Sequence, residues 1–492
     1  FSSQLFAQSG QVAADTHTIP QLQVKERDAF ITQLMSKMTL TEKIGQLNLV
    51  SVGPDNPKEK IMADIRADKV GGVFNTVTKH DIRQMQDQVQ YSRLKIPPFY
   101  AYDVVHGQRT IFPISLGLAS SWDMNAVATS ARISAEETAA DGLNMTFSPM
   151  VDITRDPRWG RVSEGFGEDT YLTSRLAFEM VKAYQGNDPS RPDSVMANVK
   201  HYALYGAAEG GRDYNTVDMS LTRMFNDYMP PYKAALDAGA GGVMVALNSV
   251  NGIPATSNSW LLKDILRDQW KFHGLTVSDH GAIGGLVKHG VAENDRQAAA
   301  MALKSGVDMD MADNMYGQYL AGLLKDGLVS QQDIDRAVRD VLTAKWDMGL
   351  FIDPYRHLGA ASTDPVDTNA ESRLHRAEAR EVARASQVLL KNDNHTLPLQ
   401  KKGTIALIGA LANSQRDMMG SWSAAGVAKQ SVTLLQGMKD VIGNKATILY
   451  ARGSNIIDDK AIFDYLNSYE KQVFNDPRTA QQMIDEAVKT AQ

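Results

Sequence analysis

Cysteine is missing from all 492 residues of this sequence. Without thiols the chain can form no disulfide bond, no thiolate nucleophile and no cysteine-ligated zinc or iron–sulfur site. Long apolar runs are missing too, since none approaches the ~20 residues that a membrane-spanning helix requires. Disulfide-stapled folds and cysteine-dependent enzymes are therefore excluded, and we predict no transmembrane helix within these residues.

A large excess of charge of one sign is also missing. The net charge is −6, and no basic stretch stands out along the chain. Neither nucleic acid nor an acidic membrane surface is therefore an expected partner. The ten histidines include no His-x-x-x-His pair on a helical pattern, and no Asp/Asn-rich calcium loop is evident. We accordingly expect no metal ion and no other cofactor.

What the chain does have is length and an ordinary hydrophobic share of 43%. A chain this long exceeds what one hydrophobic core supports, so we expect two domains. The first residue is Phe1, and the segment up to Gln21 is polar and rich in Gln, Ser and Ala. We interpret Phe1 as a mature N-terminus left by processing, and residues 1–38 as an N-terminal extension.

A regular alternation begins at Thr39, which with Glu42 fits a capping box at the start of what we predict to be the first helix. The apolar residues that continue this helix are Ile44, Leu47 and Leu49. Nearly continuous apolar runs then alternate with helical stretches, as in parallel sheets buried on both faces. The runs are Gly71–Val77, Pro98–Val105, Met145–Ile153, Val195–Ala203, Gly241–Val250, Leu275–Asp279 and Gly306–Met311. This pattern predicts a (β/α)8 barrel over residues 39–352.

A second α/β pattern follows the barrel. We expect a closing barrel helix after Ser330, a linker over residues 353–384 and an α/β sandwich domain over residues 385–492. The elements predicted beyond the barrel are a helix at Ala370–Leu390, strands at Thr404–Ile408 and Ala446–Ala451, a helix at Val432–Ile442 and a final amphipathic helix with Ile484, Ala487, Val488 and Ala491 on one face. Such a helix feeds a further strand, so we expect this sandwich domain to be truncated at its C-terminal end.

Polar residues end several of the apolar runs, where a barrel places its catalytic groups. They are Asp103, His106, Asp152, Arg158, Arg161, Lys200, His201, Asp279 and His280. A mixture of carboxylate, lysine, histidine and arginine around one pocket suits an uncharged, polyhydroxylated ligand such as a sugar. Taken singly, each residue also has a structural explanation as a helix cap, a core histidine or an ion-pair partner. Their joint position at strand ends is what favours a binding site.

Four motifs give this arrangement a resemblance. Asp103-Val-Val-His-Gly107, Arg155-Asp-Pro-Arg-Trp-Gly-Arg161, Lys200-His201 and Thr276-Val-Ser-Asp279 resemble, in order and spacing, signatures of family 3 glycoside hydrolases. The resemblance covers roughly Thr39 to the end and is closest to the bacterial periplasmic β-glucosidase type. It implies a retaining, exo-acting enzyme that removes terminal non-reducing β-D-glucosyl residues. It also implies a periplasmic or secreted location, small β-glucosides and oligosaccharides as partners, and leaves a homodimer open.

The resemblance also assigns roles. Asp279 is the expected nucleophile that forms a covalent glycosyl-enzyme intermediate. The residues expected to bind sugar hydroxyls are Asp103, Arg161, Lys200 and His201. The segment Gly420-Ser-Trp-Ser423 is similar to a loop that reaches the pocket from the second domain, with Trp422 facing the leaving group, although Trp422 could equally be a core residue of that domain.

The sequence departs from the family pattern at three points. Leu247 stands where many members carry a tyrosine near the nucleophile, and His280 stands where many plant members have a tryptophan. The proton-donating Glu of two-domain members is expected beyond Gln492. The loop after Lys200-His201 contains no histidine, which excludes the branch that uses a His-Asp pair, and the setting of Glu209 has nothing to raise a carboxyl pKa.

Other functions remain compatible with the sequence alone. Within the same family, a β-xylosidase or α-arabinosidase differs from a β-glucosidase by a few pocket atoms. In another enzyme class, Lys200 in a barrel suits a Schiff-base aldolase. A non-catalytic glycan-binding protein is a third alternative, although aromatic residues amount to only 7% and form no evident cluster.

Overall fold

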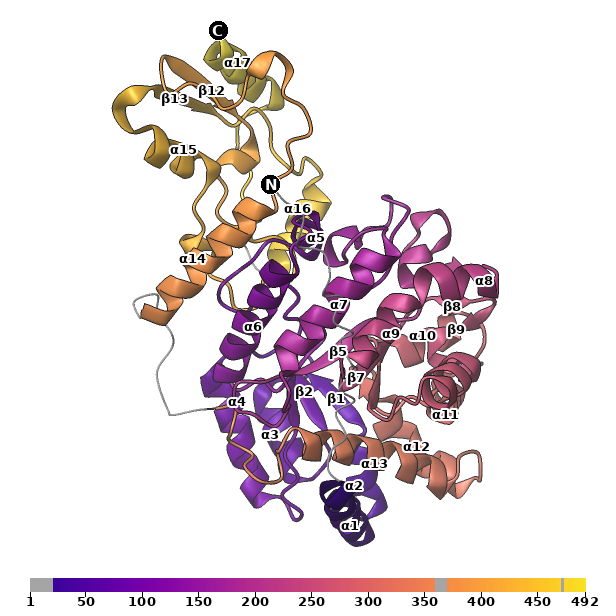
Figure 1. Cartoon of the computed structure of the whole chain (residues 1–492). Helices are drawn as coiled ribbons and strands as arrows, with labels where there is room; N and C mark the ends of the chain where they lie inside the picture. Colours follow the sequence, from indigo (N-terminus) through magenta and orange to yellow (C-terminus); the bar gives the residue numbers. More distant parts are fainter. Residues whose placement is uncertain (1–20, 359–369, 470–472) are drawn as a thin grey trace, which may run out of the picture.

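The computed structural model describes residues 21–358, 370–469 and 473–492, which form a large barrel and a smaller second region (Figure 1). Residues 1–20 of the expected extension and residues 359–369 of the expected linker lie outside the described residues. The prediction that the first helix starts after Thr39 is wrong. Helix α1 (Gln21–Lys37) precedes it and packs on the closing helix of the barrel, with the ring of Phe30 5.0 Å from that of Trp346.

Eight parallel strands form the barrel, in the order β10-β7-β5-β4-β3-β2-β1-β11. A single bridge between Val277 and Met309 connects the two ends of this series and nearly closes the cylinder. The barrel strands are β1 (Asn48–Ser51), β2 (Gly72–Phe74), β3 (Phe99–Tyr102), β4 (Met145–Thr146), β5 (Met196–Tyr202), β7 (Gly242–Val245), β10 (Leu275–Ser278) and β11 (Asp310–Met311). The predicted (β/α)8 barrel is therefore confirmed.

Strand β1 is the barrel strand that the sequence pattern missed. Thr39 and Glu42 do form a capping box, but helix α2 (Leu40–Gln46) ends at Leu47. Leu49 lies in β1, between β2 and β11, and not in the helix. The reason is tertiary: this strand is four residues long, and its pairing partners come from both ends of the barrel. Its apolar residues, Leu49 and Val50, are too few to indicate a strand period by themselves.

Helices surround the strands and cover them from outside (Figure 1). They are α3 (Lys58–Arg66), α4 (Lys79–Gln86), α5 (Ser115–Ser120), α6 (Met124–Ala140), α7 (Thr170–Gln185), α8 (Leu221–Arg223), α9 (Pro230–Asp237), α10 (Ala282–Lys288), α11 (Asp295–Ser305), α12 (Met315–Lys325) and α13 (Gln331–Asp347). Ser330 caps α13 as predicted, with Asp333 completing a capping box. A small sheet of β6 (Thr216–Val217), β8 (Ser249–Val250) and β9 (Ile253–Pro254) lies outside the barrel series.

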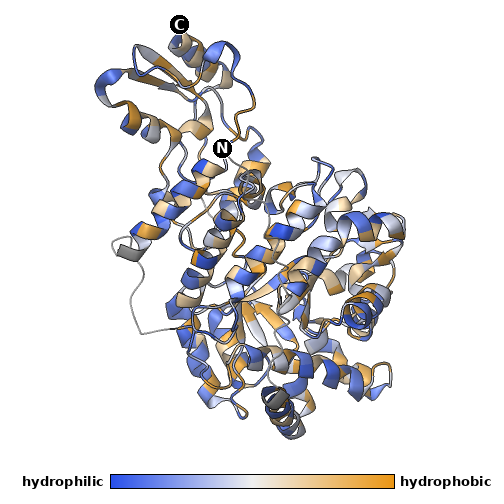
Figure 2. Ribbon diagram, in the orientation of Figure 1, coloured by the Kyte–Doolittle hydropathy of each residue, from blue (hydrophilic) through white to orange (hydrophobic). Residues whose placement is uncertain are grey.

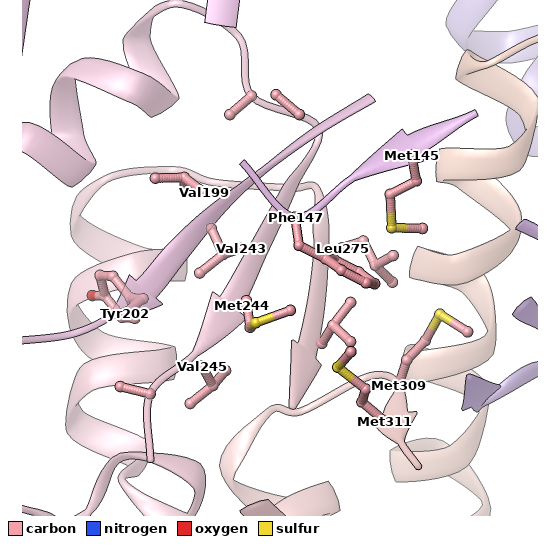
Figure 3. Close-up of a cluster of buried hydrophobic side chains, with 14 of the residues drawn as sticks. Met145, Phe147, Val199, Tyr202, Val243, Met244, Val245, Leu275, Met309 and Met311 are labelled. Atoms are coloured by element: carbon pink, nitrogen blue, oxygen red, sulfur yellow. The ribbon is translucent and has the colours of Figure 1, made fainter. Parts of the chain in front are cut away.

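The barrel interior is filled by side chains of the strands (Figure 3). Phe147, Met244, Met309 and Met311 point toward one another there, and all four are buried. Methionine adapts its shape to irregular gaps, which suits the changing width of a barrel interior. Hydropathy divides accordingly, with apolar strands inside and more polar helix surfaces outside (Figure 2). These packed side chains fill the barrel interior, and the C-terminal ends of the strands remain available for polar groups.

The second region is built on a parallel pair of strands (Figure 1). Its elements are α14 (Ala370–Ala385), β12 (Thr404–Ile408), α15 (Leu434–Ile442), β13 (Thr447–Ala451), α16 (Lys460–Tyr469) and α17 (Ala480–Ala491). Both strands were predicted, whereas α16 was not. In α17 the residue that is buried is Met483, while Ile484 and Val488 of the predicted apolar face are about half exposed. The limits of this region as a domain stay a prediction.

Candidate active site

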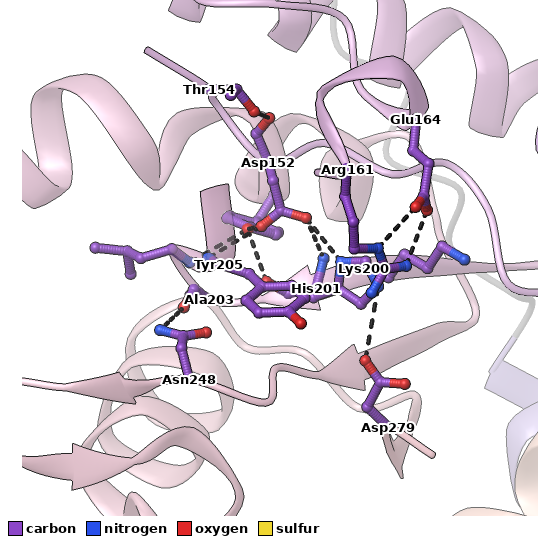
Figure 4. Close-up of polar contacts among 12 residues, drawn as sticks. Asp152, Thr154, Arg161, Glu164, Lys200, His201, Ala203, Tyr205, Asn248 and Asp279 are labelled. Carbon is purple, nitrogen blue, oxygen red and sulfur yellow. Dashed lines mark hydrogen bonds and ion pairs between the residues drawn. The ribbon is translucent and has the colours of Figure 1, made fainter. Parts of the chain in front are cut away.

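Asp279 follows β10 at the mouth of the barrel (Figure 4). The residue is 7% exposed. One carboxylate oxygen, Oδ1, accepts a hydrogen bond of 2.7 Å from the backbone N–H of His280. The other, Oδ2, has no hydrogen-bond partner among the described residues and lies 3.6 Å from His201 Nε2. Asp279 therefore presents one carboxylate oxygen that the protein itself leaves uncommitted.

Lys200 and His201 lie near the end of β5, and both are buried. The pairing of β5 with β7 changes register between Val199 and Tyr202, so this consecutive pair sits in an irregularity of the strand. Such irregularities redirect side chains next to active sites. Lys200 Nζ donates to Asp103 Oδ1 at 2.5 Å. The structure thus joins the end of β5 to the end of β3, as the four motifs predicted.

Asp152 fixes the imidazole of His201 from behind. Its Oδ2 accepts from His201 Nδ1 at 2.8 Å, and its Oδ1 accepts from the hydroxyl of Tyr232 at 2.6 Å. The backbone N–H of Tyr205 donates to the same carboxylate at 3.1 Å. Because a carboxylate only accepts, Nδ1 carries the proton and Nε2 is the ring atom that faces Asp279. The sequence showed Asp152 at a strand end but gave no sign of this function, and nothing local signals Tyr232.

Arg161 approaches Asp279 from the loop after β4, where it forms a two-pronged ion pair with Glu164 at 2.7 and 2.9 Å. Burial raises the pKa of Glu164, but Arg161 and Lys200 outweigh it and lower that pKa to about 2. Burial lowers the pKa of Arg161, but Glu164 and, more weakly, Asp279 raise it above its usual value. The arginine is therefore both the ion-pair partner and the site residue that the sequence offered as alternatives.

Tyr205 forms one wall of the site. Its ring centroid lies 5.0 Å from that of His201 and 5.2 Å from that of Trp159, both edge to face. The guanidinium carbon of Arg161 lies 5.5 Å from the same ring. Trp159 is anchored by its Nε1, which donates to Asp213 at 3.0 Å. Aromatic packing here fixes the orientation of the His201 and Arg161 side chains. Sequence analysis missed Tyr205, which stands four residues after His201.

A loop of the second region reaches this mouth. His106 Nε2 lies 2.5 Å from the carbonyl oxygen of Ser421. The ring of Trp422 lies 5.1 Å from Lys200 Nζ and is 38% exposed. Trp422 is thus not a core residue of the second region, and its ring is accessible beside the polar groups of the barrel. Its position agrees with the predicted contact to a leaving group, which itself stays a prediction.

The structure therefore brings together all six residues proposed for the site. They are Asp103, Arg161, Lys200, His201, Asp279 and Trp422. Glu209, by contrast, is exposed on a short 3-10 turn. At Leu247, where many family members carry a tyrosine, the backbone carbonyl lies 3.0 Å from His289 Nε2. Within the described ranges, no group of three or more His, Asp or Glu residues is arranged to hold a metal ion. Nor is any helix there long and apolar enough to cross a bilayer.

Comparison with known families decides what these motifs are. The model of the glycosyl hydrolase family 3 N-terminal domain matches residues 39–344, and that of the family 3 C-terminal domain matches residues 387–492. The chain belongs to glycosyl hydrolase family 3. Its barrel and second region therefore correspond to the N-terminal and C-terminal domain models of this family, and the resemblance to the family is confirmed.

Curated relatives in this family include both glucosidases and xylosidases. The chain is 67% identical over 466 residues to the periplasmic β-glucosidase of Salmonella typhimurium, covering 94% of this chain and 61% of that protein. It is 34% identical over 452 residues to a β-xylosidase of Formosa agariphila, covering 86% of this chain and 62% of that protein. The chain thus spans about three fifths of the length of these relatives.

Solved structures of the family show the same fold. A β-glucosidase of Listeria innocua in complex with isofagomine superposes with a TM-score of 0.80 at 37% identity, covering 90% of this chain and 62% of that one. A β-glucosidase of intestinal bacteria involved in saponin metabolism gives a TM-score of 0.80 at 33% identity, covering 93% and 62%. The Listeria enzyme was also solved with glucose and, as a mutant, with laminaribiose.

Proposed function

We propose that this glycosyl hydrolase family 3 chain is part of a retaining, exo-acting β-glucosidase with Asp279 as its nucleophile. The observation that supports this most is the uncommitted Oδ2 of Asp279, next to His201 and in the field of Arg161. A carboxylate oxygen without a protein partner is free to attack an anomeric carbon. Retaining hydrolysis requires such an attack to form the covalent glycosyl-enzyme intermediate.

The groups around Asp279 suit the binding of one terminal sugar. Asp103 offers acceptors, while Lys200 and Arg161 offer donors fixed by their ion pairs. Hydroxyls that contact such charged groups bind more tightly as the sugar ring flattens toward its oxocarbenium-like transition state. His201, oriented by Asp152, provides one further ring nitrogen beside the attacking oxygen. These residues therefore orient the sugar and stabilise the transition state, and Asp279 does the chemistry.

The proton donor of the reaction is a separate question. Glu164 is unsuited to this function, because a carboxyl group with a pKa of about 2 stays ionised at neutral pH. Glu209 is exposed on a short 3-10 turn, whereas Asp279 is buried. We propose that a carboxylic acid outside the described residues protonates the leaving group. The length of the curated relatives, of which this chain covers about 61%, leaves room for it.

Two sugars, glucose and xylose, and two reactions, glycoside hydrolysis and Schiff-base aldol chemistry, have to be distinguished. We favour glucose over xylose because identity to the Salmonella β-glucosidase is 67%, against 34% to the Formosa β-xylosidase. A Schiff-base aldolase is disfavoured by the hydrogen bond from Lys200 Nζ to Asp103, because this bond engages the amine that would have to attack a carbonyl carbon. From the same relative we propose a periplasmic location. A homodimer stays an untested prediction.

Trapping the intermediate tests the assignment. The full-length protein is incubated with a 2,4-dinitrophenyl 2-deoxy-2-fluoro-β-glucoside, and its peptic peptides are analysed by mass spectrometry. We expect a single fluoroglucosyl adduct on the peptide that contains Asp279, and its absence from an Asp279→Asn variant. A label on another carboxylate would reject Asp279 as the nucleophile. Faster labelling by the corresponding β-xyloside would instead reassign the sugar.

A further inference from the structure

We propose that two buried carboxylates on helix α6, Glu137 and Asp141, position the Trp422 loop and thereby set the affinity of the enzyme for the leaving-group part of its substrate. The Trp422 loop is the segment Gly420–Gly426, and the barrel loop is the segment Gly107–Ile111. This inference rests on the proposed function. It adds two residues that belong to none of the family motifs and that act through other residues, not on the sugar.

The two carboxylates fix the barrel loop from below. Glu137 Oε2 accepts from the backbone N–H groups of Arg109 at 2.9 Å and Thr110 at 2.8 Å, and its Oε1 accepts from Thr110 Oγ1 at 2.7 Å. Asp141 accepts from Gln108 Nε2 at 2.9 Å and pairs with the guanidinium of Arg109. The side chains of Gln108, Arg109 and Thr110 and the backbone N–H groups of Arg109 and Thr110 therefore all donate to these two carboxylates.

Glu137 also contacts the second region directly. Its Oε1 lies 2.8 Å from Nδ1 of His375 on α14. Burial raises the pKa of Glu137, but the hydrogen bonds from His375 and Thr110 outweigh it and lower that pKa below its usual value. One ionised, buried carboxylate thus joins the barrel loop, α6 and α14. Removing it would leave several buried donors without an acceptor.

The Trp422 loop lies on this barrel loop. The backbone N–H of Ala425 donates to the carbonyl of Gln108 at 2.8 Å. At the other end of the Trp422 loop, the ring of His106 lies between two carbonyl oxygens, that of Phe112 at 2.8 Å and that of Ser421 at 2.5 Å. Main-chain contacts therefore fix both ends of the Trp422 loop.

Close packing reinforces these contacts. A Cβ atom on Gly426 would lie 2.7 Å from Cγ1 of Ile111, and one on Gly420 would lie 3.0 Å from Cγ2 of Ile114. Both distances are shorter than side chains normally tolerate. The two glycines at the ends of the Trp422 loop thus allow it to approach the barrel more closely than other residues would.

The Trp422 loop also has a backbone conformation that needs external support. Trp422 has φ +58° and Ala424 has φ +39°, a region that residues other than glycine rarely occupy. Such conformations persist only where the surroundings impose them, and they concentrate at functional sites. The surroundings here are the barrel loop and the carboxylates beneath it. Without them, we expect Trp422 to leave its position over Lys200, while Asp279 and His201 keep theirs.

A double-mutant cycle in the full-length enzyme tests this coupling. Glu137→Leu and Trp422→Ala are made singly and together, and cellobiose hydrolysis is compared with inhibition by gluconolactone, which occupies only the terminal sugar position. Each single variant is expected to raise KM for cellobiose about tenfold and to change the inhibition constant of the lactone less than about threefold. The double variant should be no worse than Trp422→Ala, because both changes remove the same interaction.

A glycine pair supplies a matched control that leaves the carboxylates intact. Gly426→Ala should lift the Trp422 loop off Ile111 and reproduce the rise in KM. Gly437→Ala lies in α15 of the same region, where the new Cβ meets nothing closer than Val432 Cγ1 at 3.9 Å, and should leave KM unchanged. If Glu137→Leu does not fold, as judged by circular dichroism, Gly426→Ala decides alone, and a normal KM there overturns the inference.

The remaining outcomes separate this inference from the function on which it rests. Effects of Glu137→Leu and Trp422→Ala that multiply would overturn it, because they would show independent actions. Equal weakening of cellobiose and lactone would also overturn it, since the loss would then lie at the terminal sugar. A parent enzyme that cleaves no β-glucoside would instead reject the proposed function itself.

Discussion

The barrel and the second region differ in which side chains they bury and which they expose. The barrel buries charged groups such as Asp152, Asp308 and Lys345 completely, because each has a partner. The second region leaves apolar groups exposed, with Ile484 at 47%, Val488 at 52% and Phe474 at 66%. Apolar patches of this kind are uncommon on folded monomers. A complete core thus supports the chemistry, whereas the second region has little core of its own.

This difference concerns stability as much as function. A two-stranded sheet such as β12–β13 is marginal by itself in water. Contacts with the barrel supply part of what it lacks, including the bond from Ser120 Oγ to the carbonyl of Ser386 at 2.8 Å and the contact of His375 with Glu137. We therefore expect unfolding in the second region to be the more easily provoked of the two. The predictions below test this contrast.

The largest effect should come from the mouth of the barrel without any loss of stability. Asp279→Asn removes the attacking oxygen, so kcat/KM on an aryl β-glucoside should fall by about 10⁴-fold or more, equivalent to at least ~5 kcal/mol. The melting temperature should stay within about 2 °C, because Oδ2 makes no hydrogen bond in the described structure. Azide should restore part of the activity of an Asp279→Gly variant. A loss below tenfold would place the nucleophile elsewhere.

The next largest effect should be a loss of stability, and it should follow from breaking the hydrogen-bond network around Asp152. Asp152→Ala leaves His201 and Tyr205 with unpaired buried donors, and the free energy of unfolding should drop by ~3–5 kcal/mol. Urea unfolding followed by tryptophan fluorescence measures it. Asp268→Ala, at an exposed position on the barrel surface, is the control and should be near neutral. Equal effects of the two changes would contradict the idea that buried polar networks stabilise the barrel.

In the second region the same kind of test should single out one side chain. Met483→Ala removes the one residue of α17 that is fully buried and should cost ~2–4 kcal/mol. Val488→Ala, five residues further along the same helix at a half-exposed position, should cost less than ~0.5 kcal/mol in this 492-residue chain. Hydrogen exchange of β12 and β13 reports the difference locally. If Val488→Ala proves as costly as Met483→Ala, the exposed face is covered in solution.

The smallest effect depends on pH. Asp310 lines a cavity of about 900 Å³ at the edge of β11, and burial raises its pKa to about 7. In the unfolded chain the group ionises near 4, so between pH 4 and pH 7 the folded state keeps a proton that the unfolded state has lost. Its contribution to stability therefore falls as pH rises through this window. Asp310→Asn should make the protein more stable than the parent at pH 8 by ~1–3 kcal/mol, and nearly equal at pH 4.

Thermal melts of both proteins across pH 4–8 measure this difference. A parent and variant whose melting temperatures differ by the same amount at every pH would show that Asp310 does not titrate in this range.

Sequence reasoning succeeded where the signal was local and repeated. Strand β12 was predicted with its exact bounds, and the barrel class followed from seven apolar runs that alternate with helices. It failed at β1, a four-residue strand that directly follows helix α2, and at α1, whose apolar residues are spread around the helix with little preference for one face. Period alone cannot decide a four-residue strand, because its pairing partners are distant in sequence.

The site divides in the same way. Asp103, Arg161, Lys200, His201 and Asp279 could be named from the sequence because a parallel barrel places the ends of its strands around one mouth. What supports them could not. Asp152 acts on His201 across 49 residues, and Tyr232 meets Asp152 across 80. The seat of the Trp422 loop depends on contacts between His106 and Ser421 that are 315 residues apart.

The sequence by itself thus determined the periodicity of the chain, hence the barrel, and the residue types at the strand ends, hence the family and its chemistry. The tertiary structure alone decided three things. They are which oxygen of Asp279 has no hydrogen-bond partner, which ring nitrogen of His201 donates to Asp152, and which side chains fix the Trp422 loop. The physical reason is that hydrogen bonds and ion pairs act over about 3 Å in space and are indifferent to separation along the chain. Such contacts form only once the strands and helices are in place.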